Sequence, residues 1–137
     1  PDALMNVLKS INKLRSKNER LITLIGCGGN RDESKRPIMG KIASSESDKV
    51  ILTSDNPRFE NPMKIIDSIY KGIPEKFQGK VIKEVNRKDA IKIGVGLMKS
   101  NDILLIAGKG HEKFQDVNGK QIHFDEKLIL KKIAKKC

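Results

Sequence analysis

The sequence predicts an α/β domain of three layers, in which helices cover both faces of a mostly parallel sheet. Continuous apolar runs at residues 21–25, 50–53 and 103–107 are typical of strands that are buried on both faces. Segments with helical features alternate with these runs along the chain, as they do in parallel sheets. The length of 137 residues is enough for one apolar core, so we predict a single domain over residues 1–137.

The first half of the chain contains two predicted helices and two predicted strands. Apolar residues at helical spacing predict a helix over residues 2–17. The run 21–25 is a strand, and the glycine-rich residues that follow it predict a sharp turn. Pro37 is suited to a first helical turn and opens a helix that ends near Ser47, after which the strand 50–53 follows.

The second half continues the alternation of helices and strands. Pro62 predicts the start of a helix that ends near Tyr70, and a shorter strand follows at residues 81–85. A helix is expected over residues 87–99, with Asp89 in its first turn, where a carboxylate favours the helix dipole.

The C-terminal part of the chain begins with its most apolar strand, at residues 103–107. Residues 121–124 are predicted to form an edge strand, in a hairpin that turns at Asn118 and Gly119. Asp125 is expected to cap a last helix.

The formal net charge of +11 means that the surface attracts anions, including nucleotides and nucleic acids. The lysines are scattered, however, and no group of aromatic residues accompanies them as a stacking surface. We therefore interpret most of them as solvated helix faces and expect no nucleic-acid partner. A stand-alone basic module that binds nucleotides or nucleic acid remains the alternative, and a steep salt dependence of binding would favour it.

Cysteine use and hydropathy bear on location. Cys27 and Cys137 are the only cysteines, which indicates a reducing compartment, and neither lies near a histidine at the spacing of metal ligands. No apolar run is long enough to span a bilayer, and no signal peptide is recognisable. We expect a cytoplasmic protein without a metal site of its own. Because the chain begins at Pro1 rather than at a methionine, we also expect it to belong to a longer protein.

Three polar loops directly follow apolar strands, at residues 28–32, 55–58 and 108–112. Parallel strands bring their carboxyl ends to one edge of a sheet, where ligands bind in open α/β folds. Together the loops offer two arginines and two carboxylates, which complement the carboxylate and ammonium groups of an amino acid. Residue types alone favour a simpler alternative, in which Asp55 and Arg58 pair with each other and stiffen a turn.

Other sequence patterns are less specific. The residues around Lys109 look like a phosphate loop but lack the first glycine and the Ser or Thr of a Walker A motif. No G-x-G-x-x-G follows the first strand, which argues against a dinucleotide-binding oxidoreductase.

Four motifs in register resemble one family. They are residues 26–32 (GCGGNRD), 35–40 (KRPIMG), 53–58 (TSDNPR) and 107–112 (AGKGHE). Their order and spacing are similar to those in the C-terminal domain of the UDP-N-acetylmuramoyl-tripeptide synthetases, the Mur ligases of the third step of peptidoglycan synthesis. The D-N-P-R and G-K-G-H-E pair argues against other members of the superfamily, such as folylpolyglutamate synthetases.

The resemblance implies a Rossmann-like three-layer fold and a site for a diamino acid. In the family, D-N-P-R marks enzymes that add meso-diaminopimelate to UDP-MurNAc-L-Ala-D-Glu. Carried over by position, the amino-acid-binding residues are Arg31, Asp55, Asn56, Pro57, Arg58, Gly108 and Glu112. One position departs from the family, because Asn30 stands where an aspartate is usual.

The resemblance also implies what other domains supply. ATP and Mg²⁺ are expected to be held mainly by a central domain, and the UDP-sugar by an N-terminal domain, neither of which is in this chain. Within this chain Arg31, Lys35 and Arg36 are the candidates for contacts to ATP phosphates. No catalytic residue is assigned here, so the isolated chain is expected to be inactive.

Overall fold

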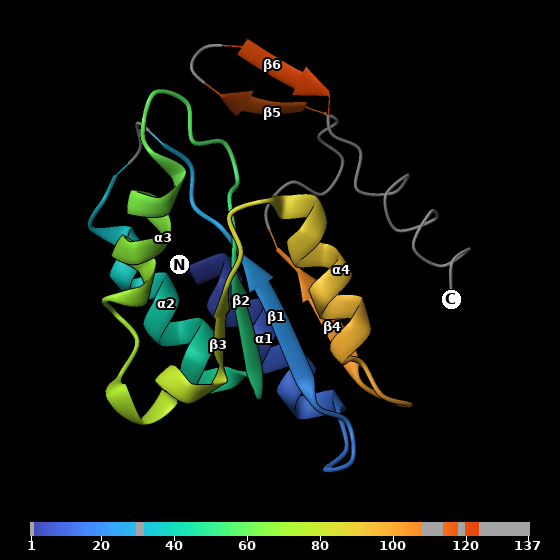
Figure 1. Ribbon diagram of the computed structural model, residues 1–137. Coiled ribbons are helices and arrows are strands. Elements are labelled where there is room, and N and C mark those ends of the chain that lie inside the picture. Colours follow the sequence, from blue (N-terminus) through green and yellow to red (C-terminus); the bar gives the residue numbers. More distant parts are fainter. Residues whose placement is uncertain (1, 30–31, 108–113, 118–119, 124–137) are drawn as a thin grey trace.

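The computed structural model describes residues 2–29, 32–107, 114–117 and 120–123, and Figure 1 shows their arrangement. The helices are α1 (Asp2–Leu14), α2 (Lys35–Glu46), α3 (Pro62–Tyr70), the 3₁₀ helix η1 (Glu75–Lys80) and α4 (Arg87–Leu97). The strands are β1 (Leu21–Ile25), β2 (Lys49–Leu52), β3 (Val81–Lys83), β4 (Ile103–Ile106), β5 (Phe114–Val117) and β6 (Lys120–His123).

Four of the strands form one parallel sheet in the order β3-β2-β1-β4. The chain first moves outward from β1 to β3 and then crosses back to place β4 on the other side of β1. The strand order therefore reverses at β1, and such a reversal opens a crevice at the carboxyl ends of the strands. The predicted parallel α/β sheet is confirmed.

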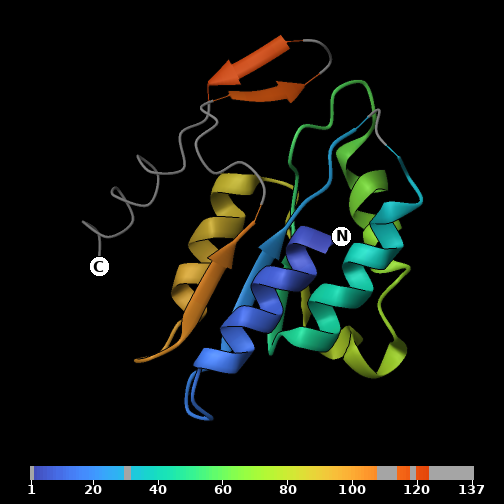
Figure 2. The ribbon, with the colours of Figure 1, turned by 180° about the vertical axis from the view of Figure 1, so that it is seen from behind.

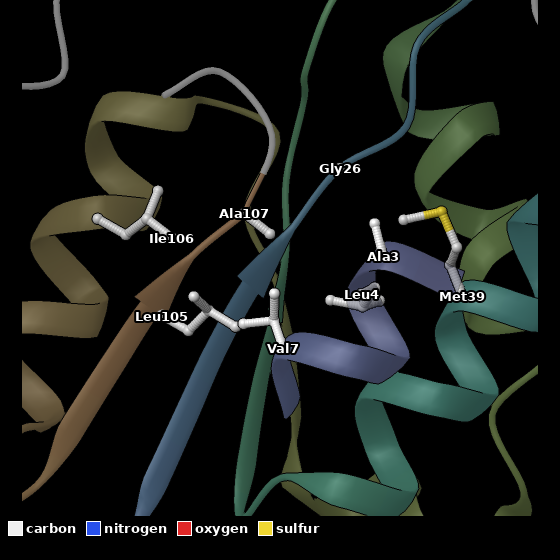
Figure 3. Close-up of a pocket in the computed structure, with 8 residues that line it drawn as sticks. All are labelled: Ala3, Leu4, Val7, Gly26, Met39, Leu105, Ile106 and Ala107. Carbon is white, nitrogen blue, oxygen red and sulfur yellow. The ribbon is translucent and has the colours of Figure 1, made fainter. Parts of the chain in front are cut away.

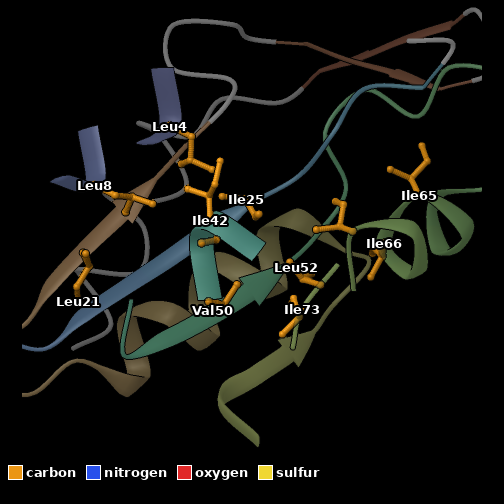
Figure 4. Close-up of a cluster of buried hydrophobic side chains, with 12 residues drawn as sticks. Leu4, Leu8, Leu21, Ile25, Ile42, Val50, Leu52, Ile65, Ile66 and Ile73 are labelled. Carbon is orange, nitrogen blue, oxygen red and sulfur yellow. The ribbon is translucent and has the colours of Figure 1, made fainter. Parts of the chain in front are cut away.

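Helices cover both faces of this sheet. Helices α1, α2 and α3 lie on one face and α4 lies on the other, as the two opposite views show (Figures 1 and 2). In β1, Leu21 and Ile25 pack toward α1 and α2 (Figure 4). The alternate residues Ile22 and Leu24 pack toward α4. All four side chains are fully buried, and each such burial contributes roughly 1.5–3 kcal/mol.

The sequence determines where α3 and α4 begin. Asn61 accepts a hydrogen bond from the backbone N–H of Met63, and Pro62 occupies the first turn of α3. Asn86 accepts in the same way from the N–H of Asp89 at the start of α4. The predicted bounds of α3 and the predicted start of α4 are confirmed.

Several predicted details need correction. Helix α2 begins at Lys35, before Pro37, and η1 was not expected from the sequence. Strands β5 and β6 pair antiparallel, as the hairpin prediction requires, but they form a separate two-stranded sheet and not an edge of the main sheet. The hairpin turn itself and the helix expected after Asp125 lie outside the described residues.

A partly buried ion pair, in which the Asp102 side chain is buried, joins the amino ends of β1 and β4. Arg20 donates from Nε and Nη2 to Asp102 Oδ2, at 3.0 and 2.7 Å, and Asp102 also accepts from the backbone N–H of Lys99. The Arg20 guanidinium, followed by the Lys99 amide, lowers the pKa of Asp102 to about 2. Folding thus favours the ionised form of this carboxyl.

We expect Asp102→Asn to lower the melting temperature at neutral pH. The folded pKa lies below the unfolded one, so this contribution is complete above about pH 4 and is lost as the pH falls toward 2. Thermal unfolding from pH 7 to pH 2 should therefore show a difference between variant and wild type that shrinks at the acid end. Asp67→Asn is the control, since its ion pair with Lys83 is exposed and should contribute little. A difference that stays constant with pH would contradict this account.

Candidate functional site

The loops that follow β1 and β2 touch through their backbones at the carboxyl edge of the sheet. The N–H of Gly29 donates to the carbonyl oxygen of Asn56 at 2.6 Å. A Cβ at Gly29 would lie 1.8 Å from the carbonyl oxygen of Pro57, and one at Gly26 would lie 2.6 Å from that of Thr53. Glycine is therefore required at both positions, because any side chain would push the two loops apart.

Arg58 lies where these two loops meet. Its Nη1 donates to the carbonyl oxygen of Gly29 at 2.9 Å and to that of Asn56 at 3.4 Å. Its φ is 52°, in the left-handed region that non-glycine residues rarely adopt. Strained backbone of this kind is concentrated at binding and active sites, where the surrounding structure maintains it.

The rest of the D-N-P-R motif is positioned by the strand before it. The N–H of Thr53 donates to the carbonyl oxygen of Ile25, which continues the pairing of β1 and β2 by one residue. Asp55, Asn56 and Arg58 are half-buried, whereas Pro57 is buried against Gly29. Three polar side chains of the predicted set thus lie together at the predicted edge.

Arg36 and Lys35 differ in their surroundings although they are adjacent. Lys35 is exposed at the first turn of α2. Arg36 is buried, and its Nη2 donates to Glu60 Oε2 at 2.8 Å and to the carbonyl oxygen of Gly28 at 3.3 Å. Arg36 thus joins the first loop to the segment just after Arg58, which favours a role inside the domain over a contact to phosphate.

We expect Glu60→Gln to destabilise the fold by roughly 1.5–3 kcal/mol, because it weakens a charge-assisted hydrogen bond of a buried guanidinium. Glu33→Gln is the matched control. Glu33 also pairs with Arg36, but at 3.8 Å and with its side chain 74% exposed. Urea unfolding of both variants tests this, and equal losses of stability would contradict the central role given to Glu60.

A third loop begins at the same edge, after β4. The N–H of Ala107 donates to the carbonyl oxygen of Leu24, so the chain leaves β4 beside the end of β1. The carbonyl oxygen of Ala107 accepts from Arg87, a buried arginine at the start of α4 that sequence reasoning did not single out. A buried arginine looks like any helix-surface arginine in the sequence, so only the fold reveals it.

Part of the predicted site lies outside the described residues. These positions are Arg31, Gly108 and Glu112, together with Asn30. Their roles remain predictions, which rest on the family resemblance and on the strand ends that lead to them.

An apolar cavity of about 400 Å³ lies beside the loops, between α1 and the ends of β1 and β4 (Figure 3). Leu4 and Val7 of α1 face Leu105 of β4 across it, and Gly26 and Ala107 border it at the carboxyl edge. Its lining is almost wholly apolar, which does not suit charged groups. The polar candidate residues belong to the loops beside it.

Cys27 follows β1 within the first loop and is mostly buried. Its Sγ lies 3.5 Å from Met39 Sδ, and burial raises the pKa of the thiol to about 11. The thiolate is the nucleophilic form of cysteine, so this thiol is unreactive at neutral pH. Cys27 is therefore a packed residue of the first loop and not a nucleophile.

Within the part of the chain that the structure describes, no three His, Cys, Asp or Glu side chains are grouped as metal ligands would be. None of the described helices combines the length and apolar composition that a bilayer span requires.

The loops and the fold match a known family. The family model for the glutamate ligase domain of Mur ligases matches residues 1–110. The chain belongs to the Mur ligase family. The resemblance found in the four sequence motifs and the Rossmann-like fold that it implied are confirmed.

Curated members of the family are similar over nearly all of this chain. A UDP-N-acetylmuramoyl-L-alanyl-D-glutamate–2,6-diaminopimelate ligase of Aquifex aeolicus is 50% identical over 133 residues, which are 97% of this chain and 27% of the relative. The ligase of the same name from Bacteroides fragilis is 47% identical over 133 residues, with the same two coverages. The chain thus spans about a quarter of the length of these relatives.

A solved structure of a UDP-N-acetylmuramoyl-L-alanyl-D-glutamate–2,6-diaminopimelate ligase agrees with the fold. It aligns with a TM-score of 0.89 and 39% identity over 99% of this chain, and over 27% of its own. The alternative of a stand-alone basic module is not supported, because this Mur ligase domain matches part of much longer ligases.

Proposed function

We propose that this domain binds the amine substrate of an ATP-dependent amide ligase that adds meso-diaminopimelate to UDP-MurNAc-L-Ala-D-Glu. The observation that carries the proposal is the contact between the first loop and the D-N-P-R loop, through Gly29, Asn56 and Arg58. The names of the relatives, at 47–50% identity, support the same substrate.

The charges of the site complement this substrate. Meso-diaminopimelate carries two carboxylates and two ammonium groups. Arg31 and Arg58 are proposed to bind carboxylates, while Asp55 and Glu112 accept hydrogen bonds from ammonium groups. Asn56, Pro57 and Gly108 complete the site: the amide offers donors and an acceptor, the proline stiffens the turn, and the glycine lets the backbone approach the ligand.

The proposed reaction has two steps. The D-Glu γ-carboxylate of the UDP-linked substrate attacks the γ-phosphorus of ATP, which forms an acyl phosphate and releases ADP. An uncharged amine of the diamino acid then attacks the acyl carbon, and the tetrahedral intermediate expels phosphate to leave the amide. The residues of this domain orient the amine and exclude water from the acyl phosphate.

The nucleotide and its Mg²⁺ are proposed to be held mainly outside this chain, in the central domain that the family resemblance implies. From this domain, Arg31 and the exposed Lys35 remain candidates for phosphate contacts, whereas the pairing of the buried Arg36 with Glu60 fits that role less well. We expect the whole ligase to work in the cytoplasm and the isolated chain to be inactive.

The test is the choice of amino acid by the full-length protein. Purified enzyme with ATP, Mg²⁺ and UDP-MurNAc-L-Ala-D-Glu is assayed for phosphate release with meso-diaminopimelate, lysine or ornithine. We expect the highest kcat/KM with meso-diaminopimelate, because lysine and ornithine lack the distal carboxylate. A preference for lysine or ornithine would refute the proposed substrate. Phosphate release by the isolated chain under the same conditions would refute the proposal that ATP and Mg²⁺ are held mainly by another domain.

A further inference from the structure

Among the residues that the structure describes, Arg87 is the largest fully buried side chain, with only 2% of its surface exposed. It is the first residue of α4, directly after the capping residue Asn86. Burying a guanidinium is costly unless its donors are satisfied. The N–H donors of a buried guanidinium are therefore expected to form hydrogen bonds with acceptors elsewhere in the domain.

The donors of Arg87 reach two backbone carbonyls at the carboxyl edge of the sheet. Nη1 donates to the carbonyl oxygen of Ser54 at 3.2 Å, and Nη2 donates to that of Ala107 at 3.1 Å. Ser54 directly precedes Asp55 of the D-N-P-R loop, and Ala107 directly precedes Gly108. One side chain thus joins the last residues before two of the three candidate loops.

Direct strand pairing does not join the ends of β2 and β4. Strands β2 and β4 are not neighbours, because β1 lies between them in the order β3-β2-β1-β4. Their ends are connected through β1 and, directly, through the guanidinium of Arg87. The planar fork of arginine holds two acceptors at a fixed separation, which a single ammonium group cannot do.

We propose that Arg87 is a positioning residue of the amino-acid site, which sets the separation between Ser54 and Ala107, the residues that directly precede Asp55 and Gly108. It contacts neither substrate nor nucleotide and acts through the carbonyls of Ser54 and Ala107. The proposal rests on the proposed function, since a ligand with two amino-acid ends needs both loops at a defined distance.

Arg87→Lys in the full-length protein tests the proposal. Lysine keeps the charge but loses the fork, so the two loops are no longer held together. Because a misplacement of 1 Å can reduce a rate about a hundredfold, we expect KM for the diamino acid to rise about tenfold or more. The KM values for ATP and for UDP-MurNAc-L-Ala-D-Glu should change less than about twofold, since other domains hold most of those contacts.

Arg20→Lys is the matched control. Arg20 also donates to a backbone carbonyl, that of Leu97, but it lies at the amino end of the sheet, away from the loops. Both variants should lower the melting temperature, and only Arg87→Lys should raise KM for the diamino acid. An unchanged KM in Arg87→Lys, or an equal rise in Arg20→Lys, overturns the proposal. If the lysine variant does not fold, Arg87→Gln is used for the same comparison.

The wild-type assay separates this proposal from the proposed function. If wild type prefers lysine or ornithine, the proposed substrate is wrong. The KM values of Arg87→Lys and Arg20→Lys are then compared with the preferred amino acid. Hydrogen–deuterium exchange of residues 53–58 provides a measurement that needs no substrate. Faster exchange there in Arg87→Lys than in Arg20→Lys supports the positioning role, and equal exchange overturns it.

Discussion

If the proposed substrate is correct, replacing Arg58 with alanine in the full-length protein is expected to reduce kcat/KM with meso-diaminopimelate roughly a hundredfold or more. With lysine or ornithine the reduction should stay within about tenfold, because neither has a distal carboxylate that could lose a bidentate contact. The guanidinium already lies at the meeting point of two loops, where its Nη1 binds the carbonyl oxygens of Gly29 and Asn56. The variant therefore also measures how much of the role of Arg58 is structural.

Arg58→Lys distinguishes the structural part from the ligand-binding part. A lysine retains a positive charge but cannot provide a planar fork, so the loss with meso-diaminopimelate should remain. Steady-state kinetics of wild type and both variants with the three amino acids make the comparison. Equal losses of kcat/KM with all three amino acids would mean that Arg58 only stabilises the turn, as in the alternative in which Asp55 and Arg58 pair with each other.

The backbone at Arg58 gives this experiment a second readout. A non-glycine residue with a φ of 52° is strained, so Arg58→Gly should relieve strain while removing the guanidinium. Arg58→Gly should therefore be more stable than Arg58→Ala but just as poor with meso-diaminopimelate. If Arg58→Gly is more stable than Arg58→Ala while both lose activity with meso-diaminopimelate equally, the backbone strain affects stability and the guanidinium affects substrate specificity.

The sequence was sufficient to predict the parallel sheet and the contact between the loops that follow β1 and β2. Strands that are apolar throughout, such as Leu21–Ile25, indicate burial on both faces, and the alternation with helices then requires parallel pairing. Parallel pairing alone brings residues after β1 and β2 to one edge, which the contact between Gly29 and Asn56 bears out. The prediction therefore depended on topology and needed no side-chain detail.

The roles of buried charges could not be predicted in the same way. Arg36 and Arg87 both lie in the first turn of a helix, and the sequence does not distinguish an arginine that points to solvent from one that points inward. Besides Glu60, their partners include the backbone carbonyls of Gly28, Ser54 and Ala107, and every residue has such a carbonyl, so the sequence does not indicate which ones accept. Only the tertiary structure brings donor and acceptor together.

The hairpin of β5 and β6 shows a second structural feature that the sequence could not predict. The turn signal at Asn118 and Gly119 correctly indicated that two strands pair. The same signal says nothing about which sheet the strands join, because local turn chemistry fixes only the pairing of the two arms. The expected edge strand therefore became a two-stranded sheet of its own.

Gly29→Ala is expected to disrupt amino-acid binding more than any other single methyl group added to the described part of the site. The new Cβ would lie 1.8 Å from the carbonyl oxygen of Pro57 and 2.5 Å from its carbonyl carbon. These are backbone atoms, so no side-chain rotation can relieve the overlap and the D-N-P-R loop must move. Because a displacement of about 1 Å can reduce a rate a hundredfold, we expect a loss of that order in kcat/KM with the diamino acid.

Gly96→Ala is the control for the added methyl group. Gly96 lies in α4, and a Cβ there would meet nothing within 4 Å. Because Gly96 lies in the last turn of α4 with room for a Cβ, alanine should stabilise the protein by roughly 0.4–1 kcal/mol and leave the kinetics unchanged. Neither glycine has a left-handed φ, so the two substitutions differ in steric overlap and not in backbone preference. If Gly29→Ala retained wild-type kcat/KM, the two loops would not need their close contact, and the site built on that contact would be wrong.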